Sequence, residues 1–451
     1  MARNGVLTGE RLGDKLEPGK HAFLAFDFRL PTTMAQRPCT CDPPPAVDLT
    51  RFYQQESDDA GTGIRSVDEP NDSDHQDADG IRRQLVENLQ TSGWSPVELN
   101  VSELLDSRTN RDDCPPILRS HATWKEDLVE LFESEHIASK VASKAVIYRA
   151  AESGAPGTVE PKQSWETCRC TCSQDKADDR RDTRSATVAN RMQEWAVVLH
   201  SVAVTIRRIL QLPKNLLLQE DPCDPKNRHY TDTNGEALQC CTDLLRAFFY
   251  DTAADKSDIP VSSPVTSMGS NVHTDWGSFT VVWQDDIGGL QTYCHACDRW
   301  VDVAANASSK CNVIRFVVHI GDVTSLAMGH AMQTTSGGQD TVAAGGGRVV
   351  WPSPRHRVLS PTAHQRGSLV YFAYPPPDKS IQAITVKLAK WIYQQARLAS
   401  LGPVCVPYDD YYLLRNQSSI SAVPARQQYD AIVDRPLKFV LDEKWEQVQR
   451  S

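Results

Sequence analysis

The sequence predicts a mainly β protein with flanking helices, whose strands form an antiparallel sandwich or jelly roll. Short runs rich in β-branched and aromatic residues recur after Asp221, and turn residues separate them. Longer segments with apolar residues at helical spacing lie before and after these runs. The chain has 451 residues, of which 40% are hydrophobic, so a sizeable core is available.

Composition excludes several classes of function. The formal net charge of -10 makes a nucleic-acid partner unexpected, because phosphate binding needs a basic surface. No apolar run reaches the roughly 18 residues of a membrane span, and the first 20 residues lack the apolar core of a secretory signal. A cytoplasmic location is therefore expected, and the 13 cysteines, an odd number, are expected to be free thiols.

Residues 1–230 are expected to form an N-terminal, mainly helical region. Apolar residues at helical spacing predict helices over 81–92, 123–146 and 187–211. Gly93 and Pro213 provide the stop signals for the first and the last of these helices.

Shorter segments of this N-terminal region are expected to be strands or loops. The run 94–101 predicts a strand, and 46–53 predicts a strand or a passage from strand to helix. The acidic segment 56–80 and the cysteine-containing segment 167–186 are polar, so both are expected to be exposed loops.

Residues 231–380 are expected to form the jelly-roll core. The predicted strands are 244–251, 278–284, 289–294, 299–303, 314–320 and 368–374. The glycine-rich segment 335–348 predicts a flexible loop between strands. Residues 381–451 are expected to form a C-terminal helical extension, with helices over 380–401 and near 437–448.

Two separated stretches of the core contain candidate metal ligands. His273 and Asp275 lie two residues apart at the beginning of a predicted strand, where side chains at i and i+2 share a face. His356 lies on a later predicted strand, followed by Arg366 and Ser368. Two histidines and one carboxylate on a common face suit Fe(II) and oxygen chemistry, because other coordination positions stay open.

As a set, these residues resemble the 2-oxoglutarate- and Fe(II)-dependent dioxygenases of the isopenicillin N synthase-like group. The close resemblance covers about 240–375, and the earlier residues match more loosely. The matching segments are His273-Thr274-Asp275-x-Gly277, Gln284-Asp285-x-x-Gly288-Gly289-Leu290-Gln291, Trp300, Ile320-Gly321-Asp322, His356-Arg357-Val358 and Arg366-x-Ser368.

The resemblance implies a double-stranded β-helix core with iron held by His273, Asp275 and His356. It implies that Arg366 and Ser368 bind the distal carboxylate of 2-oxoglutarate, for which a planar guanidinium and a hydroxyl are suitable donors. The implied reaction consumes O2 and 2-oxoglutarate, releases succinate and CO2, and oxidises a small organic substrate by default to its hydroxylated product. Ascorbate is a candidate reductant.

The chain departs from the family pattern in two places. Relatives carry an asparagine and, two residues on, a tyrosine where this chain has Phe248 and Tyr250. Tyr250 is therefore a candidate cosubstrate residue, and the pocket beside it is expected to be more apolar. The spacing between His273 and His356 is longer than usual, so the 335–348 insertion is expected near the site, as a candidate lid.

The sequence is also compatible with other functions and other metal sites. An oxidase of the same fold that does not use 2-oxoglutarate would keep the same ligands, and a metal-free β-sandwich could bind a ligand without catalysis. Cys294-x-x-Cys297 could hold zinc, but a structural zinc site needs four ligands and no second such pair exists. His319 and His330 have no assignable partners and are expected to be structural. The identity of the substrate and the oligomeric state do not follow from the sequence.

Overall fold

The computed structural model describes the chain in blocks, all within one compact unit, Cys41–Ser451. The described residues are 43–53, 72–106, 118, 121–133, 146–148, 162–168, 183–219, 243–250, 268–294, 297–306, 312–335, 351–361, 363–398, 434–437 and 440.

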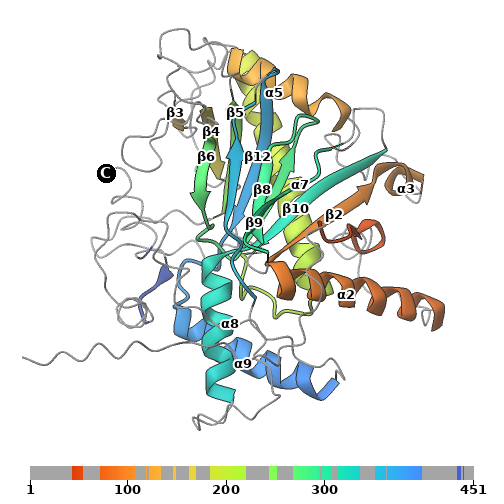
Figure 1. The fold of residues 1–451 in the computed structure, drawn as a ribbon, viewed down its shortest axis with the longest axis vertical. Coiled ribbons are helices and arrows are strands. Elements are labelled where there is room, and N and C mark those ends of the chain that lie inside the picture. Colours follow the sequence, from red (N-terminus) through yellow and green to blue (C-terminus); the bar gives the residue numbers. More distant parts are fainter. Residues whose placement is uncertain are drawn as a thin grey trace, which may run out of the picture. The chain divides into compact units, whose positions relative to one another are not determined.

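Two β-sheets form the centre of the structure (Figure 1). The larger one has eight strands, in the order β1-β2-β10-β7-β12-β5-β4-β3, and the smaller has four, in the order β6-β11-β8-β9. The strands are β1 (Val47–Asp48), β2 (Trp94–Asn100), β3 (Val146–Tyr148), β4 (Lys162–Cys168), β5 (Leu244–Tyr250), β6 (Met268–His273), β7 (Phe279–Gln284), β8 (Leu290–Cys294), β9 (Arg299–Asp302), β10 (Val313–Ile320), β11 (His356–Leu359) and β12 (Arg366–Ala373).

This architecture confirms the predicted mainly β fold with antiparallel sheets and flanking helices. Apart from the short parallel pair β1–β2, the strand pairs are antiparallel. Strands β5, β7, β8, β9, β10 and β12 lie where the sequence predicts them. The N-terminal strands complete the larger sheet, since β2 pairs with β10 and β4 pairs with β5.

Three strands were not predicted, namely β3, β4 and β6, and the last two flank the functional site. β4 has the sequence KQSWETC and β6 has the sequence MGSNVH, so neither contains a run of β-branched or aromatic residues. The expectation that the whole of 167–186 is an exposed loop was wrong at both ends: Thr167 and Cys168 belong to β4, and 183–186 belong to helix α7 (Thr183–Ile209). Pairing with neighbouring strands determines both β4 and β6, and local propensity does not reveal that.

Most of the main helices lie at or near their predicted positions. The main helices are α2 (Asp72–Ser92), α3 (Val101–Asp106), α5 (Trp124–Glu133), α7 (Thr183–Ile209), α8 (Asp322–Thr335) and α9 (Ile381–Leu398). Gly93 ends α2 with a φ of 76°, as the sequence indicates. Helix α2 begins inside the predicted acidic loop, α5 ends earlier than predicted, and α3 and α8 were not predicted.

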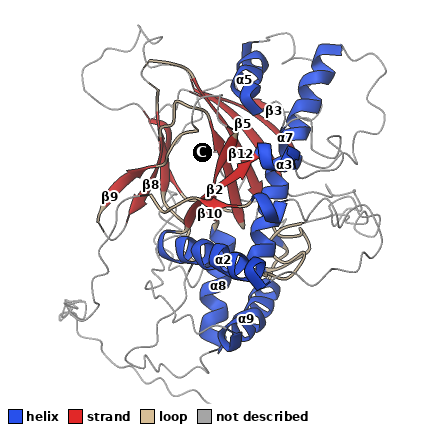
Figure 2. Ribbon diagram, turned by 90° about the vertical axis from the view of Figure 1, so that its right-hand side faces the viewer, coloured by secondary structure: helices blue, strands red, loops and turns tan. Residues whose placement is uncertain are grey.

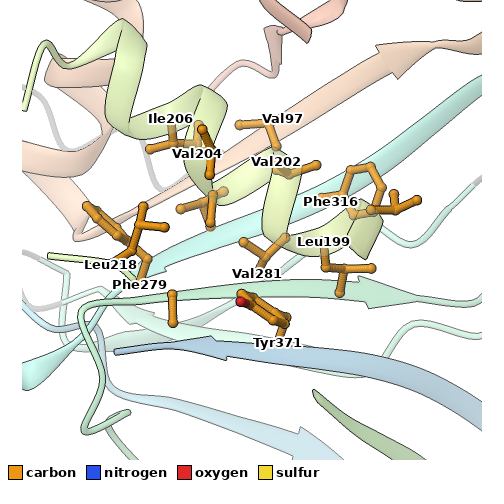
Figure 3. Close-up of a cluster of buried hydrophobic side chains, with 14 of the residues drawn as sticks. Val97, Leu199, Val202, Val204, Ile206, Leu218, Phe279, Val281, Phe316 and Tyr371 are labelled. Carbon is orange, nitrogen blue, oxygen red and sulfur yellow. The ribbon is translucent and has the colours of Figure 1, made fainter. Parts of the chain in front are cut away.

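The main hydrophobic core lies between α7 and the outer face of the larger sheet. Side chains from α7, including Leu199, Val202 and Ile206, pack with Val281 and Phe316 from β7 and β10 (Figure 3). Figure 2 shows α7 and α5 on one side of the larger sheet and strands β8 and β9 on the other. No helix among the described residues is long and apolar enough to cross a membrane.

A second, smaller core lies between the two sheets. Phe248, Val282 and Val317 from the larger sheet pack with Leu290 and Val358 from the smaller one. Alternation along β10 directs Val317 into this inner cluster and Phe316 into the outer core. Residues that follow the same alternation as Val317 therefore face the space between the sheets, where the candidate site lies.

Candidate metal centre

The structure brings together His273, Asp275 and His356, the three predicted metal ligands. Their donor atoms all lie within 4.8 Å of one another. His273 ends β6 and lies opposite His356, which begins β11. Oδ1 of Asp275 lies 3.7 Å from Nε2 of His273 and 3.6 Å from Nε2 of His356.

The local geometry of the H-x-D segment differs from the prediction in one respect. His273 and Asp275 were expected on one face of a strand, but β6 ends at His273 and β7 begins only at Phe279. Asp275 lies in the connecting loop, and its carboxylate is buried. The loop conformation, not strand alternation, therefore places Asp275 beside the two histidines.

Backbone carbonyls orient both histidine rings. Nδ1 of His273 lies 2.7 Å from the carbonyl oxygen of Asn271, and Nδ1 of His356 lies 3.1 Å from that of Pro354. A carbonyl can only accept, so each Nδ1 carries the proton and each Nε2 presents a lone pair. Both lone pairs belong to the nitrogens that face Oδ1 of Asp275.

The electrostatics of the cluster favour the forms that bind metal. Burial lowers the pKa of His273 to about 3, and His356 acts in the same direction. Burial alone would raise the pKa of the Asp275 carboxyl, but His356, His319 and His273 outweigh it and lower the pKa well below its usual range. A neutral His273 and an ionised Asp275 are the states that a metal requires of these ligands.

This donor set fits a divalent transition metal such as Fe(II). Two imidazole nitrogens and one carboxylate oxygen converge from one side, which leaves coordination positions for other molecules. A bound cation would also offset the cost of the buried Asp275 charge. Among the described residues, no other group of three or more metal-binding side chains forms such a cluster.

Several backbone hydrogen bonds fix the loop that contains Asp275. The amide of Asp322 donates to the carbonyl of Asp275 over 2.7 Å, and the amide of Gly321 donates to that of Ser278 over 2.9 Å. Thr274 also donates to the carboxylate of Asp322 over 3.1 Å. The Gly321-Asp322 segment therefore holds the metal-ligand loop from the start of α8.

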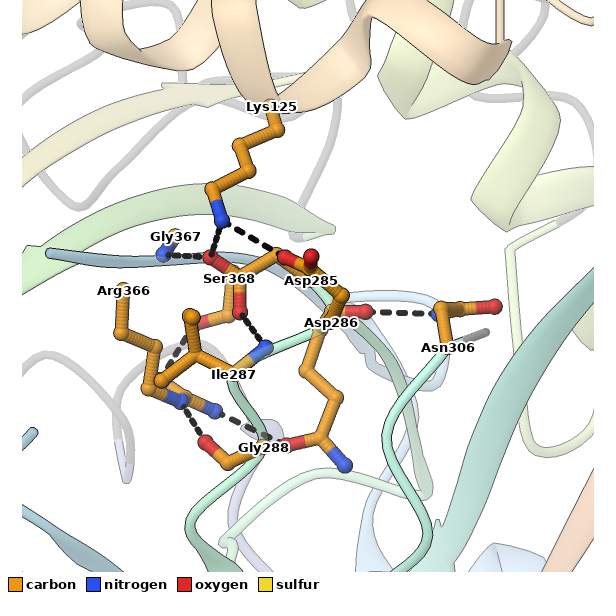
Figure 4. Close-up of polar contacts among 10 residues, drawn as sticks. Lys125, Asp285, Asp286, Ile287, Gly288, Asn306, Arg366, Gly367 and Ser368 are labelled. Atoms are coloured by element: carbon orange, nitrogen blue, oxygen red, sulfur yellow. Dashed lines mark hydrogen bonds and ion pairs between the residues drawn. The ribbon is translucent and has the colours of Figure 1, made fainter. Parts of the chain in front are cut away.

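Arg366 lies at the other end of the inner space, completely covered by protein. It is 1% exposed, and its Nε donates to the carbonyl of Gly288. Nη1 lies 3.2 Å from Oγ of Ser368, and Nη2 lies 3.3 Å from Oε1 of Gln284. Within the described residues, these three hydrogen-bond partners are all neutral. Figure 4 shows Arg366 beside Gly288 and Ser368.

Asp285 supports the segment that contains Arg366. Its carboxylate accepts hydrogen bonds from the amide of Gly367 over 2.7 Å and from that of Ile287 over 3.0 Å (Figure 4). Lys125 lies 3.8 Å from the same carboxylate. Burial raises the pKa of Asp285, although the two amides, Arg366 and Lys125 oppose the rise.

Tyr250 and Phe248 line the inner face next to Arg366. Tyr250 pairs with Arg366 between β5 and β12, and the guanidinium lies 4.6 Å from the centre of its ring. Phe248 lies 6.1 Å from Tyr250, ring centre to ring centre, and belongs to the inner apolar cluster. Two aromatic rings therefore line this part of the inner face, and Nζ of the buried Lys162 lies 5.1 Å from the centre of the Phe248 ring.

Sequence reasoning missed two residues of the site. Gln284 was part of a matched segment but received no role; the signal was a polar side chain ending a fully buried strand. His319 was expected to be structural, yet its Nδ1 lies 3.7 Å from Oδ2 of Asp275. Its signal was a histidine immediately before the matched Ile320-Gly321-Asp322 segment.

The remaining candidates lie apart from the cluster or outside the described residues. Cys294 and Cys297 lie on the β8–β9 hairpin with their Sγ atoms 3.3 Å apart, and they belong to no group of three metal-binding side chains in the described part. Three other parts lie outside the described residues: the segment 336–350 with most of the candidate lid, the rest of the cysteine-containing segment up to residue 182, and the side chain of His330.

Comparison with known proteins assigns residues 241–375 to the profile of the 2OG-Fe(II) oxygenase superfamily. Feruloyl CoA ortho-hydroxylase 1 from Arabidopsis thaliana is 33% identical over 119 residues, which is 26% of each chain. Gibberellin 20 oxidase 1-D from Triticum aestivum is 30% identical over 122 residues, 27% of this chain and 26% of the relative. The match thus spans about a quarter of the length of these curated relatives.

Solved structures that align with this chain have low sequence identity to it. A full-length Neurospora crassa protein in complex with alpha-KG aligns with a TM-score of 0.46 and 15% identity, over 78% of this chain and 95% of that one. The dioxygenase for auxin oxidation in rice aligns with a TM-score of 0.42 and 19% identity, over 80% of this chain and 96% of that one.

Proposed function

Residues 241–375 belong to the 2OG-Fe(II) oxygenase superfamily, and from this we propose that the protein is an Fe(II)- and 2-oxoglutarate-dependent dioxygenase. The proposed reaction oxidises a small organic molecule, by default through hydroxylation, and releases succinate and CO2. Within the superfamily, the proposal places the chain in the isopenicillin N synthase-like group, on the matched segments around His273, His356 and Arg366.

The observation that carries the proposal is the buried guanidinium of Arg366. Arginine keeps its charge at any relevant pH, and a buried charge without a hydrogen-bonded counter-charge is costly. The hydrogen-bond partners of Arg366 in the described structure, Gly288, Gln284 and Ser368, offer only neutral oxygens. The distal carboxylate of 2-oxoglutarate would supply a directly bound negative charge, with Ser368 as a second donor.

The metal-binding residues lie on the same inner side of the structure. His273 and His356 would hold Fe(II) through Nε2, and Asp275 would hold it through Oδ1. The chemistry that Fe(II) supplies when bound together with 2-oxoglutarate is the activation of O2 for the oxidation of an unreactive C–H bond.

The protein's own contribution is to bind, orient and keep water away. Arg366 and Ser368 fix one end of the cosubstrate, and the three ligands fix the metal, so the reacting groups are held in a constant relation. Phe248, Tyr250 and Leu290 give the space between the sheets an apolar wall. Apolar side chains exclude water and so protect reactive species from side reactions with solvent.

Anaerobic titration of the Fe(II)-loaded protein with 2-oxoglutarate tests this function. Chelation of Fe(II) by the keto acid produces a visible charge-transfer band. We expect the band in the parent, its loss in His356→Ala, and its appearance only at much higher 2-oxoglutarate concentration in Arg366→Ala. Iron binding without a band in the parent would contradict the use of 2-oxoglutarate, and absence of iron binding would contradict the metal centre.

A further inference from the structure

His319 lies next to two of the metal-binding residues, Asp275 and His356. It belongs to β10, where it pairs with Thr280 of β7 and Trp94 of β2 in the middle of the larger sheet. Its side chain follows the same alternation as Val317, so it faces the space between the sheets. The residue is 0% exposed, so its ring nitrogens depend on other protein groups for hydrogen bonds.

The two oxygens of Asp275 face different histidines. Oδ1 faces Nε2 of His273 and Nε2 of His356, as described above, whereas Oδ2 lies 3.7 Å from Nδ1 of His319. The His319 ring also packs against His356, with ring centres 4.6 Å apart and planes at 51°. The His319 ring therefore packs against one metal ligand, His356, and its Nδ1 approaches another, Asp275.

Three buried polar atoms at this place lack hydrogen bonds. Neither nitrogen of His319 has a partner among the described residues, and neither has Oδ2 of Asp275. An unsatisfied buried polar atom is costly, and native proteins contain few of them. Here a donor and an acceptor without partners face each other, and closing the gap to hydrogen-bond length requires a shift of only about 1 Å.

We propose that His319 is a positioning residue for the metal-binding carboxylate: its Nδ1–H donates to Oδ2 of Asp275 and so keeps Oδ1 directed at the two Nε2 atoms. The proposal rests on the metal centre of the proposed function and adds a residue to it. His319 itself is not a ligand, since it does not belong to the cluster of donor atoms formed by the described residues.

The physical consequence concerns metal affinity. A carboxylate that is free to rotate presents either oxygen or both. Metal binding must then fix its orientation, and the lost conformational entropy weakens the binding. Partners that orient a metal ligand typically change metal affinity about 10–100-fold when they are removed. Loss of the Nδ1–H of His319 is therefore expected to weaken Fe(II) binding while the three ligands remain in place.

Three substitutions separate the hydrogen bond from packing. The amide nitrogen of His319→Asn occupies the place of Nδ1, whereas that of His319→Gln occupies the place of Nε2. His319→Leu has similar bulk and no donor. Each purified protein is titrated anaerobically with Fe(II) alone, in competition with a chromogenic chelator, and the thermal unfolding of its metal-free form is recorded alongside.

We expect His319→Asn to bind Fe(II) within about threefold of the parent, and His319→Gln and His319→Leu to bind about 10–100-fold more weakly. His319→Asn and His319→Gln both place an amide in the core, so the comparison between these two variants remains informative even if His319→Leu does not fold. Equal binding by Asn and Gln, or parent-like binding by all folded variants, would overturn the role of His319. Failure of the parent to bind Fe(II) would instead overturn the metal centre itself.

Discussion

His273 and His356 lie opposite each other across the β6–β11 ladder, with ring centres 4.2 Å apart. The two residues are far apart in the sequence, and only the pairing of these strands brings them together. The same strand β11 also pairs with β8, where His356 lies opposite Thr292. The register of the smaller sheet therefore determines whether two of the three ligands can share a metal, because a slip by one residue would turn His356 to the other face.

Arg366→Lys is expected to weaken binding of 2-oxoglutarate about 10–100-fold. A lysine keeps the charge, but it cannot donate at once to Gly288, Gln284 and Ser368 and still present two parallel N–H groups to a carboxylate. The charge-transfer titration measures the change. Fe(II) affinity in the absence of 2-oxoglutarate serves as the control and should stay within about twofold; an equal loss of both affinities would contradict a role confined to the cosubstrate.

Gln284→Glu is expected to weaken 2-oxoglutarate binding more than Gln284→Met does. The amide oxygen of Gln284 lies 3.3 Å from Nη2 of Arg366, so a glutamate there would neutralise the arginine and repel the incoming carboxylate. Both substitutions remove the amide donor that bonds the carbonyls of Val303 and Ala304. The added charge alone should account for about a further tenfold, measured by the same titration. Similar affinities in the two variants would show that the charge of Arg366 does not attract the cosubstrate.

The parts of the site that lie in short segments could be predicted from the sequence. The spacing and order of five residues match the pattern of the dioxygenase family: His273, Asp275, His356, Arg366 and Ser368. The structure brings the first three into one cluster and the last two into contact with each other. Their neighbours in the inner cluster, such as Phe248, also lie on strands that the sequence predicts.

What could not be predicted depends on pairing between distant strands. The MGSNVH sequence of β6 has no strand signal of its own, and β11 and its partner contacts make it a strand. His319 looks like any buried histidine in the sequence, because its relation to Asp275 arises only when β10 lies beside β7. Gln284 likewise acquires a role through the neighbouring strand β12.

Asp285→Asn is expected to gain stability relative to the parent as the pH rises. Burial raises the pKa of Asp285 above its ordinary value of 3.8, so the folded protein holds a proton that the unfolded chain has already lost. The stability contributed by this group is fully present below the unfolded pKa and is lost as the pH rises through the folded pKa. An asparagine does not ionise and avoids that loss.

Urea unfolding of both metal-free proteins at about pH 3.5, below the unfolded pKa, and at about pH 7 measures the effect. The asparagine has one acceptor fewer for the amides of Gly367 and Ile287, which costs a constant amount at both pH values. The test therefore compares the free energies of unfolding of the two proteins at each pH and asks whether their difference changes with pH. A difference that stays constant, or that moves in favour of the parent at the higher pH, would show that Asp285 is not destabilised by its burial.

Gly321→Ala is expected to destabilise the fold by about 3 kcal/mol and to weaken metal binding. A Cβ at Gly321 would lie 2.0 Å from the carbonyl oxygen of Gly277, which is backbone and cannot rotate away. Gly277 in turn packs against the backbone of Ala373, where its own Cβ would approach the carbonyl oxygen to 2.7 Å. The strain would therefore pass into the loop that contains Asp275, because the neighbouring amide of Asp322 is bonded to the Asp275 carbonyl.

Gly80→Ala provides the matched control for this substitution. Gly80 lies in α2, and a Cβ there meets no heavy atom within 4 Å. The change should stabilise the protein by about 0.5–1 kcal/mol through helix propensity and leave Fe(II) affinity unchanged. Urea unfolding and anaerobic Fe(II) titration of both variants give the comparison. If Gly321→Ala lost stability but bound Fe(II) as the parent does, the Gly321–Gly277 contact would support the fold without fixing the metal-ligand loop.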